Sequence, residues 1–223
     1  DEHLLIVNKP VGIDTHPNTP KATNSLSNGV AYYFQQKSIN SKVRHIHRLD
    51  NETSGAILFA KHALSGAILD KALEERKIKR TYIALVEGSL SRSSGKIVQP
   101  IGKDRHHATK RRVSPNGQKA VTNYKVMAKL TTYPCTLVQL SLETGRTHQI
   151  RVHMSHIGHP LVGDNLYGES NTTSKTGQAL HAWKLDVPHP FEEKTISVTA
   201  PILNTFAPND VITKEVQKRL ERF

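Results

Sequence analysis

One carboxylate in this sequence follows directly on a run of basic side chains. It is Asp50 in the segment HRLDNETSG, residues 47–55, and no other acidic residue lies between Asp14 and Glu52. The basic residues just upstream are Arg44, His45, His47 and Arg48. Nearby cations favour the ionised form of a carboxylate, which prepares Asp50 to act as a nucleophile or a base. The alternative is a structural aspartate that caps a helix or a turn.

A second segment, TGRTHQIRVHMSHIGHPLVGDNLYG at 144–168, is rich in Arg and His. If the chain is helical from Thr147, Arg151 lies one turn beyond His148 on the same side, and both face a cleft. A metal site is the competing interpretation, since three histidines follow at intervals of three residues. Such a spacing drifts around a helix, the Gly-His-Pro at 158–160 interrupts it, and no HExxH motif is present. We therefore expect no metal; a histidine packed in the fold or placed near phosphates is the simpler alternative.

Composition narrows the class of protein. The 223 residues contain 31 Lys and Arg against 19 Asp and Glu, a net charge of +12, so an acidic partner such as nucleic acid is expected. The single cysteine excludes an internal disulfide, CxxC redox chemistry and a four-thiolate metal site. Neither a GxxxxGK[ST] loop nor a dinucleotide-binding glycine motif occurs, so no nucleotide cofactor is expected. No apolar run approaches the roughly 20 residues of a membrane span, and a signal peptide is lacking, which predicts a cytoplasmic protein.

Two basic stretches have alternative interpretations. The segment Lys103–Arg112, KDRHHATKRR, lies between turn-forming residues and reads as a basic loop, either a phosphate contact or a solvated charge run. The tail 210–223 has apolar residues at helical spacing, which predicts a docked terminal helix; a basic amphipathic membrane helix is its rival.

The elements that position these residues follow from hydrophobic periodicity. We predict helices over 62–77, 147–157 and 210–223. We predict strands at His3–Val7, Gly55–Ala60, Arg80–Glu87, Ala120–Met127, Thr136–Leu142 and Thr195–Ala200. This order predicts a mixed α+β fold in which helices flank a largely antiparallel central sheet, and the length favours one domain over 1–223.

Five strings in one order resemble the RluA family of pseudouridine synthases. They are NKPVG at 8–12, HRLDNETSG at 47–55, RTYIALVEG at 80–88, GRTHQIRVHMSHIGHPLVGDNLYG at 145–168 and LHAWKLDVPHP at 180–190. The resemblance implies the family's catalytic fold and an enzyme that isomerises uridine in ribosomal or transfer RNA to pseudouridine. Many relatives carry an S4-type RNA-binding domain ahead of NKP; none is present here, so a short member or a trimmed catalytic domain is expected.

The resemblance also assigns roles. Asp50 matches the catalytic aspartate, Tyr82 the tyrosine that stacks on the target base and is implicated in its deprotonation, and Arg151 the arginine that pairs with the aspartate. Arg48 matches the arginine that helps hold the nucleotide out of its stack. Without the resemblance, Tyr82 reads as a core tyrosine of a strand. The reaction breaks the bond from ribose C1′ to N1 and joins C1′ to C5 without redox change or hydrolysis, so no cofactor is expected; covalent attack and a glycal route both stay open.

We expect the partner to be an RNA stem-loop, the protein to be a monomer, and no membrane to be involved. Lys9 is either a phosphate contact or an exposed turn residue. The residues predicted to contact RNA are Lys9, His47, Arg48, Lys110, Arg111, Arg112, Arg146 and His148. A binding module without turnover and a nucleosidase or nuclease are the competing functions. The catalytic residues argue against the first, and the lack of a second paired carboxylate argues against the second.

Overall fold

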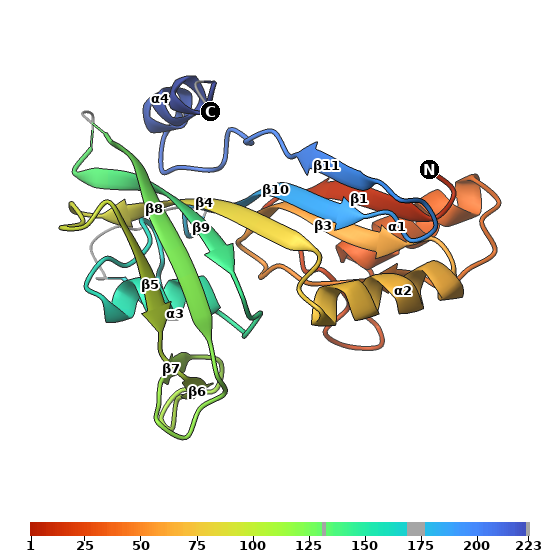
Figure 1. Cartoon of the computed structure of the whole chain (residues 1–223), viewed down its shortest axis with the longest axis horizontal. Helices are drawn as coiled ribbons and strands as arrows, with labels where there is room; N and C mark the ends of the chain where they lie inside the picture. The colour runs from red at the N-terminus through yellow and green to blue at the C-terminus, as the bar shows by residue number, and fades with distance from the viewer. Residues whose placement is uncertain (131–132, 169–176, 222–223) are drawn as a thin grey trace. The chain divides into compact units, whose positions relative to one another are not determined.

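The computed structural model describes residues 1–130, 133–168 and 177–221 (Figure 1). The helices are α1 (Leu26–Gln36), α2 (Ala63–Glu74), α3 (Gln149–His156) and α4 (Asp210–Leu220). The strands are β1 (Leu4–Lys9), β2 (Arg44–His45), β3 (Ser54–Ala60), β4 (Lys79–Glu87), β5 (Ser94–Val98), β6 (Ile101–Lys103), β7 (Arg111–Val113), β8 (Val121–Lys129), β9 (Cys135–Leu142), β10 (Leu180–Pro188) and β11 (Thr195–Thr199). None of the helices in these ranges has the length and apolar character that crossing a bilayer requires.

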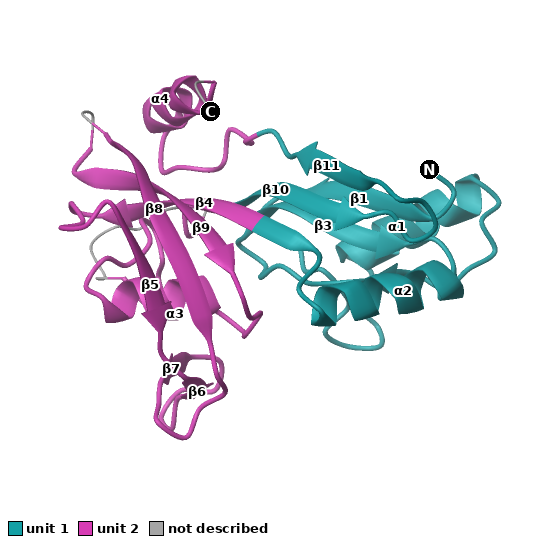
Figure 2. Cartoon of the chain, in the orientation of Figure 1, with its two compact units in different colours: residues 1–80, 182–201 teal, residues 81–181, 202–223 magenta. Residues whose placement is uncertain are grey.

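Contacts divide the chain into two compact units (Figure 2). Unit 1 comprises residues 1–80 and 182–201, and unit 2 comprises residues 81–181 and 202–223. The chain passes from one unit to the other within β4, again within β10, and a third time between residues 201 and 202. Each unit is described by itself.

Unit 1 is built on the strand order β1-β3-β10, with β2 beside β3 and β11 beside β10. All seven residues of β3 are buried, which explains its uninterrupted small and apolar sequence. Helix α2 packs against β3 through Leu69 and Ala72, which join Leu58 in the core of this unit. The Asp50 segment leads directly into β3, so the buried strand fixes one end of that segment.

Unit 2 has the strand order β4-β9-β8-β5, and β6 and β7 form a separate two-stranded hairpin. Helix α3 packs against β7 and β8. Helix α4 buries Ile212 and Val216, and its Gln217 side chain donates a hydrogen bond to the carbonyl of Ile202 (3.3 Å). This docking confirms the predicted terminal helix; of the predicted range 210–223, the last two residues lie outside the described part.

The predicted fold class is confirmed: the ladders with a described register are antiparallel, and helices accompany them. The predicted strands and helices are found with boundaries that coincide or shift by up to three residues. The sequence analysis missed α1. Its Val30, Tyr33 and Phe34 are poor helix formers, but Leu26, Val30 and Phe34 recur every four residues and are buried, and Ser25 forms a capping box with Asn28.

Candidate functional site

Asp50 lies in unit 1, between β2 and β3, and is half-buried. The backbone on both sides of it is held. The hydroxyl of Thr15 donates to the carbonyl of Leu49 (2.8 Å) and accepts from the N–H of the same residue (3.1 Å). On the other side, the N–H of Thr53 donates to the carbonyl of Asp50 (3.0 Å). These three hydrogen bonds hold the backbone on both sides of the carboxylate.

Lys9 is fully buried beneath the same segment. Its ammonium donates to three backbone carbonyls, those of Ile13 (2.7 Å), Pro10 (2.9 Å) and Asn51 (2.9 Å). Burial lowers the pKa of Lys9 to about 8, while the charges of Asp14 and Asp50 act in the opposite direction. This geometry corrects both expectations for Lys9: it is not an exposed turn residue, and its three N–H donors are used within the fold rather than on a phosphate.

The residue after Asp50 anchors a wider network. The Asn51 carbonyl also accepts from the N–H of Gly12 (3.0 Å), and its side-chain amide donates to Asp14 (3.0 Å). At the start of β3, Gly55 has a φ of +113°, and a Cβ there would overlap the backbone of Ala182. A glycine is required at this position because two strands approach closely. The NKPVG and HRLDNETSG strings thus form one structural unit around Asp50.

His47 has a structural role. Its ring is buried, and Nε2 accepts from the N–H of Leu58 (3.3 Å). Burial, and to a smaller extent the charges of Arg80 and His45, lower the pKa of His47 to about 3. The neutral ring belongs to the core instead of making the predicted contact with RNA. Arg48, in contrast, is exposed, and its predicted role stays a prediction.

Arg151 lies on α3 in unit 2 and is buried. It forms a bidentate ion pair with Asp164, through Nε to Oδ2 (2.7 Å) and Nη2 to Oδ1 (2.8 Å). Asp164 also accepts from the backbone N–H groups of Leu166 (3.0 Å) and Tyr167 (3.1 Å). The carboxylate therefore ties Arg151 to the turn that follows it. Pairing of Arg151 with Asp50 stays a prediction.

His148 and Arg151 both contact the side chain of Tyr167. That they share a side agrees with the prediction from their spacing, whereas their facing a cleft stays a prediction. The Nδ1 atom of His148 lies 2.8 Å from the hydroxyl of Tyr167, and the Arg151 guanidinium lies 5.0 Å from the centre of the same ring. His148 precedes α3 with a φ of +56°, a left-handed conformation that costs a non-glycine residue about 1 kcal/mol. In this conformation the imidazole contacts Tyr167.

Tyr82 and Arg146 of unit 2 differ in burial. Tyr82, on β4 opposite Leu140 of β9, is only 4% exposed, as a core tyrosine would be; its stacking role stays a prediction. Arg146 is exposed, and its guanidinium donates to the carbonyl of Lys119 (3.2 Å) and the side chain of Gln118 (3.2 Å). Its predicted contact with RNA also stays a prediction.

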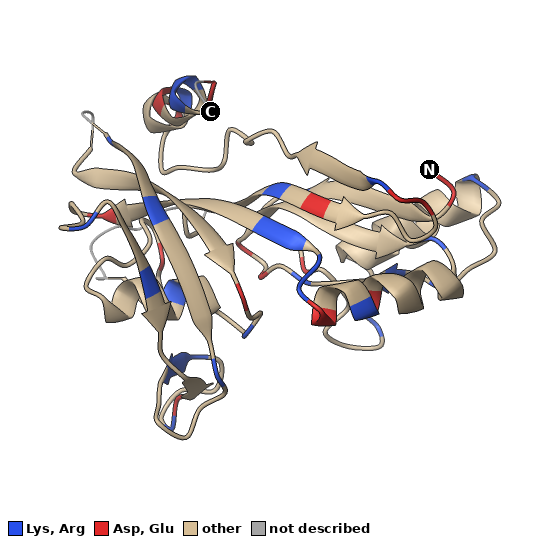
Figure 3. Ribbon diagram, in the orientation of Figure 1, with Lys and Arg blue, Asp and Glu red and all other residues tan. Residues whose placement is uncertain are grey.

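The basic segment Lys103–Arg112 runs from the last residue of β6 through the tip of the hairpin into the first two residues of β7 (Figure 3). Residues 105–109 are exposed, and Lys110, Arg111 and Arg112 are half-buried. The N–H of His106 donates to the carboxylate of Asp104 (2.8 Å), which holds the tip in a turn. The hairpin presents a concentration of positive charge suited to phosphate contact.

Of the three histidines at 153, 156 and 159, the first and the last are engaged within the fold, whereas His156 is exposed. His153 is buried, with Nδ1 2.8 Å from the Thr122 hydroxyl and Nε2 2.9 Å from the Gln99 carbonyl. His159 pairs through Nδ1 with the carbonyl of Glu87 (2.9 Å). Over the described ranges, no three His, Cys, Asp or Glu residues are grouped as metal ligands.

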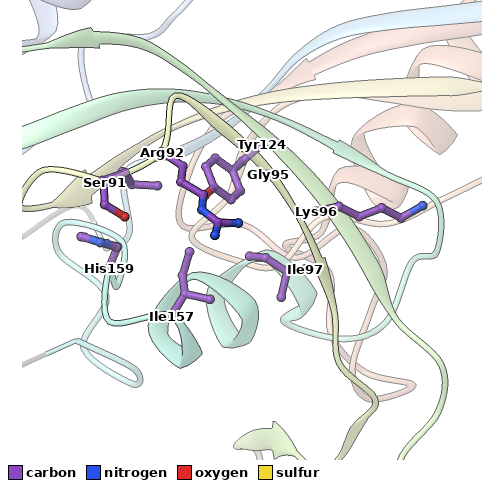
Figure 4. Close-up of a pocket in the computed structure, with 9 residues that line it drawn as sticks. Ser91, Arg92, Gly95, Lys96, Ile97, Tyr124, Ile157 and His159 are labelled. Atoms are coloured by element: carbon purple, nitrogen blue, oxygen red, sulfur yellow. The ribbon is translucent and has the colours of Figure 1, made fainter.

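A pocket of about 250 Å³ opens beyond the C-terminal end of α3 (Figure 4). The side chains of Arg92, Tyr124, Ile157 and His159 line it, whereas the ammonium of Lys96 pairs with Glu143 (2.7 Å). None of the predicted site residues belongs to its lining.

Sequence reasoning missed Asp164 and Tyr167. A signal for Asp164 was present, because it is the only acidic residue in 144–168, just as Asp50 stands alone among basic residues. For Tyr167 no local signal exists; its contacts join α3 to a hairpin about 40 residues earlier in the chain.

Comparisons with known proteins agree with this arrangement. Residues 3–156 match the family model described as RNA pseudouridylate synthase. The chain is 54% identical over 201 residues to the uncharacterized RNA pseudouridine synthase YhcT of Bacillus subtilis, covering 90% of this chain and 66% of the relative. It is 39% identical over 215 residues to the ribosomal large subunit pseudouridine synthase D of Nitrosomonas europaea, covering 93% of this chain and 62% of the relative. The chain thus spans just under two thirds of the length of these relatives.

A solved structure has the same fold. The human RNA Pseudouridylate Synthase Domain Containing 1 superposes with a TM-score of 0.77 at 26% identity, covering 99% of this chain and 92% of that one. The order of motifs, the fold and the match over residues 3–156 agree, and this chain belongs to the RNA pseudouridine synthase family.

Proposed function

We propose that this protein isomerises selected uridines in RNA to pseudouridine, with Asp50 as the catalytic carboxylate. The observation that carries the proposal is the structure around Asp50. Thr15 and Lys9 hold the backbone of its segment, while Asp50 itself is only half-buried. The chain that carries this aspartate belongs to the pseudouridine synthase family. A short, fixed carboxylate suits attack on the ribose or the base, or removal of the 2′ proton.

In this proposal Tyr82 and Arg151 of unit 2 provide base stacking and a positive charge for the reaction. The target nucleotide must leave its stack at a cost of a few kcal/mol, and stacking on an aromatic side chain returns about 1–3 kcal/mol. Breakage of the C1′–N1 bond, rotation of the uracil and formation of the C1′–C5 bond end with loss of the C5 proton and uptake of a proton at N1. The atoms of the nucleoside are otherwise unchanged, so the chemistry requires no oxidant, reductant or hydrolytic water.

The proposed substrate is a stem-loop of ribosomal or transfer RNA, bound with help from the β6–β7 hairpin, Arg48 and Arg146. The Nitrosomonas europaea relative is named a ribosomal large subunit pseudouridine synthase, which makes large-subunit ribosomal RNA the first candidate. We further propose that the protein acts as a monomer in the cytoplasm.

Purified protein incubated with unmodified transcripts carrying tritium at uridine C5 tests the proposal. We expect tritium release to water without free uracil, in one of the ribosomal or transfer RNAs. Free uracil would identify a nucleosidase instead. Tight binding to the transcripts with no tritium release from any of them would favour a binding module and contradict the isomerase.

A further inference from the structure

Tyr167 lies at the point where α3 meets the basic hairpin. Its ring has the Arg151 guanidinium 5.0 Å and the Lys110 ammonium 5.5 Å from its centre. The ring also packs against the apolar cluster that includes Val113 of β7 and Val152 of α3. A tyrosine ring attracts cations through its face, so this ring stabilises two charges that belong to different elements.

The hydroxyl of Tyr167 makes a second set of contacts. It accepts a hydrogen bond from the backbone N–H of Arg111 on β7 (2.7 Å) and lies 2.8 Å from Nδ1 of His148. A phenol oxygen can accept from one partner while it donates to another, so both contacts form at once. The hydroxyl therefore connects the hairpin backbone to the strained residue that precedes α3.

The hairpin needs such an attachment. β6 and β7 are three residues each, and an isolated two-stranded hairpin is marginally stable in water. The bond from Arg111 to Tyr167 fixes β7 to the turn at 164–168, and Asp164 of that turn holds Arg151. One short segment thus determines the place of the hairpin and the orientation of the arginine.

We propose that Tyr167 is a positioning residue that holds the RNA-contacting hairpin and Arg151 in one arrangement. The hydroxyl fixes the position of the hairpin and so determines the affinity for RNA. The ring sets the orientation of Arg151 and so controls turnover. This inference deepens the proposed function and rests on it for its kinetic consequences; the contacts of Tyr167 are independent of it.

Two substitutions separate the hydroxyl from the ring. Tyr167→Phe keeps the ring and removes the oxygen with both of its hydrogen bonds, to Arg111 and to His148. KM for RNA then rises about fivefold at unchanged kcat, as expected when the hairpin loses its bond to the hydroxyl. Tyr167→Leu removes both the oxygen and the ring, and kcat falls in addition by about tenfold, as expected for the loss of a cation–π contact that orients a buried guanidinium. The matched control Tyr124→Phe, at a tyrosine outside this cluster, leaves both parameters unchanged.

Amide hydrogen exchange tests the structural half of the proposal without RNA or turnover. In Tyr167→Phe the Arg111 amide exchanges faster than in the wild type, while the amides of β8 and β9 keep their protection. Unchanged exchange at Arg111 would overturn the hairpin attachment. Equal kcat values for the Phe and Leu variants, both with wild-type melting temperatures, would overturn the role of the ring.

The two proposals fail in different ways. If the wild-type protein forms no pseudouridine in any RNA, the proposed function is wrong, and the exchange of Arg111 together with RNA affinity still decides the role of Tyr167. If the wild type is active and Tyr167→Phe matches it in KM and in amide exchange, the proposed function stands and the role of Tyr167 is wrong.

Discussion

Replacement of Lys9 by methionine separates a positioning role from a phosphate contact. The substitution keeps the length and most of the volume of the side chain but removes the ammonium. The carbonyls of Pro10, Ile13 and Asn51 then lose their donor in the interior. We expect two consequences: a less stable unit 1 and a less ordered Asp50 segment.

The change in the free energy of unfolding depends on two opposing contributions of Lys9. Hydrogen bonds from a charged donor stabilise a protein by about 1.5–3 kcal/mol each, so the three bonds of Lys9 contribute at least about 5 kcal/mol. Burial of the ammonium opposes these bonds and outweighs the charges of Asp14 and Asp50, since the pKa of Lys9 is lowered to about 8. Because the substitution also leaves buried carbonyls without a donor, we expect a loss of about 2 kcal/mol in the free energy of unfolding for Lys9→Met.

Urea unfolding, RNA binding and single-turnover kinetics together check this prediction. We expect the lower stability, a rate constant for isomerisation reduced at least about tenfold because the Asp50 segment is no longer held, and RNA affinity within about twofold of the wild type. Lys42→Met, at an exposed lysine of the same unit, is the matched control and should change none of these. Wild-type stability combined with weaker RNA binding and a lower salt dependence would refute the reasoning and restore the phosphate contact.

Three further predictions concern other parts of the molecule. Asp164→Asn removes the carboxylate charge that pairs with the buried guanidinium of Arg151, so the free energy of unfolding should fall by about 3 kcal/mol and kcat should drop. A drop in neither would exclude Asp164 as the partner that orients Arg151. Because the pKa of His47 is lowered to about 3, the unfolded chain takes up a proton below pH 6.5 that the folded chain does not. Between pH 7 and pH 5 the wild type should therefore lose about 2 kcal/mol more stability than His47→Gln in urea titrations. Equal losses in the two proteins would contradict this. Replacing Lys110 and Arg112 by alanine should weaken RNA binding and reduce the slope of the logarithm of the RNA-binding constant against the logarithm of salt concentration by about 1.5. The value of kcat at saturating RNA should not change. An unchanged slope would mean that the hairpin charges are solvated and do not contact phosphates.

The elements that the sequence predicts well are those whose pattern is set by local burial. The predicted apolar strand at 55–60 is found as β3, and the predicted helix that follows it is found as α2. Both were predictable because each buries a continuous apolar surface in the same core. Helix α1 was not predicted because tertiary burial of Val30 and Phe34 overrides its weak propensity. The segment LHAWKLDVPHP was recognised as a motif, but its strand β10 was not predicted.

For the candidate site, residue types were predictable and partners were not. Asp50 and Arg151 stand out by charge and motif, yet the three carbonyls around the Lys9 ammonium belong to backbone that the sequence does not display. A lysine in a basic protein reads as a phosphate contact until its burial is known. Likewise, the role of Tyr167 can be inferred only from the fold, which brings Arg111 and His148 to its hydroxyl.

The central claim is that Asp50 carries an isomerisation of uridine, and the most direct measurement is pseudouridine formation by Asp50→Asn under single-turnover conditions. RNA modified by the wild type is digested to nucleosides, and pseudouridine is quantified by mass spectrometry beside Asp70→Asn, the same substitution at an exposed aspartate of α2. We predict pseudouridine with the wild type and with Asp70→Asn, and none with Asp50→Asn although it binds the RNA. Pseudouridine formed by Asp50→Asn at the wild-type rate would contradict the account.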